Sequence, residues 1–95
     1  MNITDIRVRK VSNAGPLKAY VSITIDDAFT VHDIRVIEKN ENRFIAMPSR
    51  KVGEGSEARY MDIAHPINKE TRESLQAMIL EAYDKGEGDP VPDLA

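Results

Sequence analysis

The chain has 95 residues and lacks cysteine and tryptophan, and its aromatic residues are only three tyrosines and two phenylalanines. The absence of cysteine excludes a disulfide scaffold, a thiol nucleophile and cysteine-ligated zinc or iron–sulfur sites. Readers of single-stranded nucleic acid stack bases on exposed aromatic rings, and only Tyr20 and Tyr60 are candidates for such a role. So few rings argue against a stacking platform.

Long hydrophobic runs are also missing. No apolar run approaches the roughly 20 residues that a membrane-spanning helix needs, and no basic-then-apolar leader opens the chain. We therefore expect a cytoplasmic protein that does not contact a membrane. The sequence has no phosphate-cradling loop, dinucleotide fingerprint or nucleophile elbow, so we expect neither a cofactor nor catalysis.

The length predicts one domain whose core is small. Where disulfides are absent, oligomerisation is the usual source of additional stability. The net charge is −3, and residues 86–95 contain three carboxylates together with prolines and glycines. We expect this segment to be a disordered acidic tail after a domain that spans residues 1–85. The domain itself has 13 cations and 13 anions, so any nucleic-acid site must depend on local patches.

Alternation of apolar and polar residues predicts antiparallel strands at residues 3–11, 17–25, 28–37, 44–47 and 59–64. The alternation changes phase near His32 and Asp33, which indicates a β-bulge. Asn68 is a helix N-cap candidate, and apolar residues then recur at helical spacing until Gly86. The predicted fold is α+β: an antiparallel sheet of about five strands, with one C-terminal helix packed on one face.

Two adjacent cations, Arg50 and Lys51, follow Pro48 where the chain is predicted to leave the sheet. Cations at a rigid edge are well placed to meet phosphates, and an arginine can form two hydrogen bonds to one phosphate. The competing interpretation is an ordinary solvated corner, because surface cations are common.

Several fragments of the chain resemble the SpoVG family. They are the opening TDIRVRKV, HDIRVIE at residues 32–38, FIAMPSRK at residues 44–51, DIAHPIN at residues 62–68 and the pair Thr71-Arg72. The resemblance implies a homodimer that joins the sheets of two subunits. It also implies a regulator of gene expression that binds DNA, and in some members RNA, in septation and sporulation. By the same resemblance, the basic pair of the family falls on Arg50 and Lys51, and its helix-start arginine falls on Arg72.

Other cations are further candidates for contacts with nucleic acid. Strand alternation places Arg7 and Arg9 on one face and Lys10 on the other, where the alternative is a polar face that keeps the sheet in solution. Lys69 lies in the first helical turn, where backbone N–H groups favour phosphate. Its alternative role is an ion pair with Glu73, four residues later.

The remaining alternatives concern His65 and the kind of partner. His65 precedes a proline close to Asp62, a pair that could bind metal or transfer a proton, but a structural hydrogen bond at the corner is the interpretation we favour. A protein-binding adaptor in septation or signalling is the alternative to a nucleic-acid-binding regulator. In that function the Arg50–Lys51 corner would meet an acidic protein surface.

Overall fold

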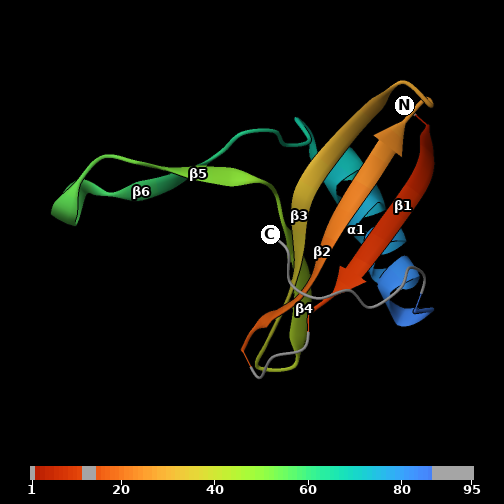
Figure 1. Ribbon diagram of the computed structural model, residues 1–95, viewed down its shortest axis with the longest axis horizontal. Coiled ribbons are helices and arrows are strands. Elements are labelled where there is room, and N and C mark those ends of the chain that lie inside the picture. The colour runs from red at the N-terminus through yellow and green to blue at the C-terminus, as the bar shows by residue number, and fades with distance from the viewer. Residues whose placement is uncertain (1, 12–14, 87–95) are drawn as a thin grey trace.

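The computed structural model describes residues 2–11 and 15–86. Four strands form one antiparallel sheet in the order β1-β2-β3-β4: β1 (Ile3–Lys10), β2 (Leu17–Ile25), β3 (Phe29–Lys39) and β4 (Asn42–Ala46). Two short strands, β5 (Ser49–Val52) and β6 (Arg59–Asp62), form a separate antiparallel pair around a 3-10 helix, η1 (Gly55–Glu57). The chain then enters the helix α1 (Lys69–Asp84) (Figure 1).

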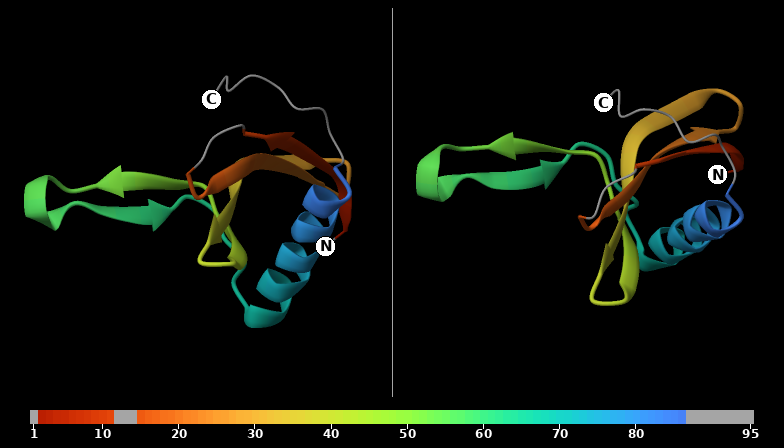
Figure 2. Two further views of the ribbon diagram at one scale, coloured as in Figure 1. Left: turned by 90° about the horizontal axis from the view of Figure 1, so that it is seen from below. Right: turned by 60° about the horizontal axis from the view of Figure 1, so that its bottom comes forward.

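The helix α1 lies on one side of the four-stranded sheet, as the two views of Figure 2 show. It packs mainly on β4 and β1. Apolar side chains at every second strand position meet the helical stripe there, because strand side chains alternate between faces. The buried core consists of Val8, Ala19, Val21, Ile23, Ile34, Val36, Ile45, Met47, Leu75, Ile79 and Ala82. The predicted α+β class, with one C-terminal helix on one face of an antiparallel sheet, is confirmed.

The predicted β-bulge is confirmed in β3. Val21 is opposite Ile34 and Ile23 is opposite Val31, so β3 has one more residue than β2 between these pairs. Asp33 within the bulge has a φ of 65°, the left-handed conformation that aspartate tolerates better than most residues. The bulge turns both Val31 and Ile34 towards the core although their sequence parity differs.

The helix begins and ends with specific polar contacts. The side chain of Asn68 accepts a hydrogen bond of 2.8 Å from the backbone N–H of Thr71, which confirms the predicted N-cap. Near the other end, the Arg43 guanidinium donates to the Asp84 carboxylate and holds the pKa of Asp84 below its usual range. The Arg43–Asp84 contact attaches the last turn of the helix to β4.

The strands after Ala46 are arranged differently from the prediction. The predicted fifth strand, residues 59–64, is shortened to β6 and does not join the main sheet. It pairs instead with β5, formed by the residues that were predicted to be a corner. We call residues 49–62 the arm, because they project from the body along the longest dimension of the molecule (Figure 1). The predicted acidic tail lies outside the described residues except for Gly86.

Candidate nucleic-acid interface

The arm carries the two cations that the sequence singled out. Both are exposed, and the register of the arm sets Arg50 opposite Met61 and Lys51 opposite Tyr60. Directly opposed residues in an antiparallel pair share a face, whereas successive residues alternate. Arg50 and Lys51 therefore point to opposite faces of a ribbon, and they cannot act as one patch on a flat corner.

A third cation, Arg59, completes the arm. It is opposite Val52, so it shares a face with Arg50 two positions away along the ribbon. Within the part of the chain that the structure describes, none of the three cations of the arm forms an ion pair. Sequence reasoning missed Arg59 because residues 59–64 were assigned to the main sheet. Two strands joined by a glycine-containing loop are the signal that could have found it.

The root of the arm is tied to the main sheet. The Arg35 guanidinium donates hydrogen bonds of 3.3 Å to the carbonyl of Met47 and to the hydroxyl of Ser49. The backbone N–H of Ile63 donates to the carbonyl of Pro48 at 2.7 Å, which extends the pairing beyond the two strands. These hydrogen bonds restrict the orientation of the arm relative to the sheet.

The tip of the arm has the opposite charge. Glu54 and Glu57 lie in the loop around η1, and both are exposed. Gly53 there has a φ of +84°, and a Cβ atom at this position would lie 2.7 Å from the carbonyl oxygen of Glu57. The loop therefore requires glycine.

Asp62 at the end of β6 is a third exposed carboxylate, so the arm has three cations, three anions and no net charge. Arg50 and Arg59 share one face, whereas Lys51 shares the other face with Asp62, so contact with phosphate is most favourable on the Arg50–Arg59 face.

The start of α1 presents the second pair of predicted cations. Lys69 lies 3.6 Å from the Glu73 carboxylate, so the ion pair weighed from the sequence is formed, between two exposed side chains. Such an exposed pair is weak and leaves Lys69 accessible to other anions. Arg72 is exposed, and its side chain forms no ion pair within the described residues. Arg72 is therefore the cation of this pair that has no competing ion pair within the described residues.

The three cations of β1 are divided between the faces of the sheet, as predicted. On the face opposite α1, Arg7 pairs with Asp5 at 2.9 Å and the Arg9 guanidinium lies 5.9 Å from the centre of the Tyr20 ring. Lys10 points to the helix side, where its ammonium lies 5.3 Å from the centre of the Tyr83 ring. These cations all have partners within the subunit, and Lys10 is not part of the same surface as Arg7 and Arg9.

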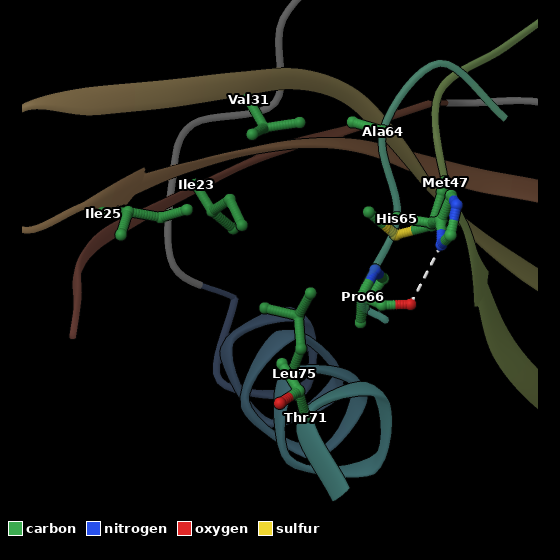
Figure 3. Close-up of a pocket in the computed structure, with 9 residues that line it drawn as sticks. All are labelled: Ile23, Ile25, Val31, Met47, Ala64, His65, Pro66, Thr71 and Leu75. Atoms are coloured by element: carbon green, nitrogen blue, oxygen red, sulfur yellow. Dashed lines mark hydrogen bonds between the residues drawn. The ribbon is translucent and has the colours of Figure 1, made fainter. Parts of the chain in front are cut away.

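His65 lies at an open apolar pocket between the sheet and the first turns of α1 (Figure 3). Its Nδ1 donates a hydrogen bond of 3.0 Å to the carbonyl of Pro66, which can only accept. This bond fits the structural interpretation of His65 at the corner. Among the described residues, no group of three or more histidine, aspartate or glutamate side chains is placed to hold a metal ion. In residues 2–11 and 15–86, no helix has the length and apolar character to cross a membrane.

Fold and surface together define a small α+β domain with a projecting two-stranded ribbon that carries three exposed cations on its strands. The sequence profile of the SpoVG family matches residues 1–85, and the chain belongs to this family. A protein of Lachnospira eligens named "Putative septation protein SpoVG" is 61% identical over 87 residues, which cover 92% of this chain and 96% of that protein. Proteins with the same name from Agathobacter rectalis and Clostridium perfringens are 64% and 56% identical. Those matches cover 87% and 90% of this chain, and 92% and 91% of the relatives.

The comparisons confirm the family resemblance that the sequence fragments predicted. They link the chain to septation proteins through the names of its relatives, and SpoVG is not known as a family of enzymes. The roles of Arg50, Lys51 and Arg72 in binding stay predictions.

Proposed function

We propose that this protein is a dimeric nucleic-acid-binding regulator of gene expression in septation and sporulation-type development. It would act in the cytoplasm, without catalysis or a cofactor. The observation that supports this most directly is the arm, a projecting two-stranded ribbon with the three cations Arg50, Lys51 and Arg59 along its strands. The major groove of duplex DNA accepts a two-stranded β-ribbon, so the shape of the arm and the cations on its strands fit the same ligand.

In this proposal the cations of the arm contact phosphates, and Arg72 at the start of α1 extends the contact. Each neutralised phosphate releases bound counterions, so the affinity falls as the salt concentration rises. Phosphate contacts orient a protein on the duplex but do not distinguish sequences. Sequence preference would come from side chains of the arm or helix that reach base edges, or from the shape of the duplex.

The proposal is tested by fluorescence anisotropy of labelled duplex DNA and single-stranded RNA at several salt concentrations. The Arg50→Ala, Lys51→Ala double variant should bind more weakly. The slope of log affinity against log salt concentration should be shallower by about 2 for each subunit that contacts the duplex, about 4 for the dimer, because each subunit loses two phosphate contacts. Lys18→Ala with Lys39→Ala is the matched control, since it removes the same charge from the body of the domain.

The outcomes separate the proposal from its alternative. Weaker binding with a shallower salt dependence in the arm variant, with the control close to wild type, supports the regulator. If wild-type protein binds neither nucleic acid at low salt, or if both double variants lose the same affinity, the arm is not a phosphate-binding element and the proposal is wrong.

A protein-binding adaptor is the second candidate, and the apolar surface of the arm favours it. Tyr60 and Met61 in the arm are 74% and 47% exposed, and Ile63 directly after the arm is 65% exposed. Contacts with phosphate do not require these apolar side chains. Aromatic and methionine side chains are enriched in protein interfaces. A septation protein that binds the Arg50→Ala, Lys51→Ala variant as well as it binds wild type would support the adaptor.

A further inference from the structure

The main sheet has two edge strands, β1 and β4, and the helix treats them differently. Along β4, the backbone N–H of Ile45 donates to the side chain of Gln76 in α1 at 3.2 Å, and the Arg43–Asp84 ion pair joins the same strand to the helix. Along β1, within residues 2–11 and 15–86, no hydrogen bond reaches the backbone from the side away from β2. The outward N–H and C=O groups of β1 can therefore pair with a further strand.

The free edge of β1 is regular over most of its length, and it lies on the side of the sheet away from the arm (Figure 1). Ile6–Lys10 pairs with β2 in unbroken register, and the irregularity of this pairing lies between Ile3 and Asp5. The strand contains no proline, a residue that commonly blocks pairing at sheet edges. On the helix side Ile6 is only partly buried, so an apolar side chain of an added strand would cover it.

The charges of β1 favour one kind of partner. The strand has three cations and one carboxylate, and Arg7 and Arg9 lie on the face opposite α1. The side chain of Arg7 is 81% exposed, and its ion pair with Asp5 joins two exposed groups and is therefore weak. A second copy of β1 would bring cations close to cations, and opposed like charges destabilise a sheet. An acidic strand would instead bring carboxylates to the same cations.

We infer that the free edge of β1 binds an extended segment of another protein in which acidic and apolar residues alternate. The segment adds a fifth strand to the main sheet, with its carboxylates beside Arg7 and Arg9 and its apolar side chains beside Ile6. Alternation places both sets correctly, because successive strand residues point to opposite faces. Backbone hydrogen bonds supply the affinity, and the side chains supply the selectivity. This surface is separate from the arm and does not depend on the proposed nucleic-acid function.

Fluorescence anisotropy of labelled peptides of about nine residues, added to the full chain, tests the inference. The test peptide alternates glutamate with valine. One control peptide has lysine in place of each glutamate, which reverses its charge. A second control keeps the glutamates and valines but has a methyl group on every backbone nitrogen, which removes the donors that strand pairing needs.

Matched protein variants locate the site. Arg7→Glu with Arg9→Glu reverses the charge beside the free edge, and Lys18→Glu with Lys39→Glu makes the same change in charge on β2 and β3. Circular dichroism establishes that each variant is folded, and Arg7→Gln with Arg9→Gln replaces the first variant should it not fold. Amide hydrogen exchange of the wild type, with and without the test peptide, reports directly on the backbone of β1.

We expect the test peptide to bind wild type, and to bind the Arg7→Glu, Arg9→Glu variant about 10-fold or more weakly. The two control peptides should bind wild type much more weakly, and the bound test peptide should slow exchange of the β1 amides that point away from β2. Equal binding of the methylated peptide, or an equal loss in the Lys18→Glu, Lys39→Glu variant, would mean that charge alone attracts the peptide and would overturn the inference. Slower exchange of the same β1 amides as the concentration of the protein alone rises would assign the edge to a second copy, and would also overturn it.

Discussion

Replacing Ile79 with alanine tests how much the contact between helix and sheet contributes to stability. Ile79 is completely buried in the core, on the face of α1 that meets the sheet. The substitution removes three buried carbon groups, worth about 0.8 kcal/mol each in transfer free energy, and leaves a cavity. We expect a loss of about 3 kcal/mol from a total stability of roughly 5–14 kcal/mol for a domain of this size.

Urea denaturation followed by far-ultraviolet circular dichroism measures this loss, since the chain has no tryptophan. All variants are compared at one protein concentration, because the proposed dimerisation would make apparent stability depend on concentration. Leu80→Ala is the control: Leu80 is on the same helix but only partly buried, so its replacement should cost clearly less. An Ile79→Ala variant that loses under about 1 kcal/mol, or no more than Leu80→Ala, would refute the packing described above.

Three further predictions concern local features. Asn68→Ala should lower the free energy of unfolding by about 1 kcal/mol because the N-cap bond is lost, whereas Asn68→Asp should retain most of it; urea titration measures both. Since hydrogen bonding to Arg43 lowers the folded-state pKa of Asp84, this ion pair stabilises the fold above the unfolded carboxyl pKa, and its contribution disappears as the pH falls through the folded value. Stability measured against pH should therefore fall less on acidification in Asp84→Asn. Gly53→Ala should speed amide hydrogen exchange in the arm more than Gly55→Ala, because a Cβ at position 55 meets open space.

The main sheet and the helix could be predicted because their apolar residues recur at the spacing of a strand or of a helix, and these residues are the buried ones. In β2, alternate residues face the core and solvent, and the phase change at Asp33 marked the extra residue of the bulge. The N-cap was predictable from the local chemistry of Asn68. The N-cap depends on residues close in the sequence, and the strand and helix patterns depend on contact with the single core of the domain.

The arm could not be predicted in the same way. Its strands have no buried face, since β6 is exposed along its whole length, so burial imposes no alternation. The pairing of Ser49 with Asp62 depends instead on contacts across a loop that the sequence pattern does not specify. The sequence singled out the adjacent cations Arg50 and Lys51, whose role in binding stays a prediction, but it did not indicate that they lie on opposite faces of the arm.

The charge pairs were only partly predictable. The spacing of Lys69 and Glu73 allowed an ion pair, and the structure forms it. The Arg43–Asp84 pair joins residues 41 positions apart, so no local pattern indicated it. The places of Arg59 on the arm and of Arg35 at its root could not be predicted either, because the position of the arm depends on tertiary contacts.

The most direct test of the central claim is a titration of isotope-labelled protein with a short DNA duplex, followed by amide chemical shifts. The amides of β5, β6 and the first turn of α1 should shift first, and these shifts should diminish as salt is added. Shifts confined to the uncovered face of β1 and β2, or no shifts at low salt, would contradict the claim that the arm binds nucleic acid.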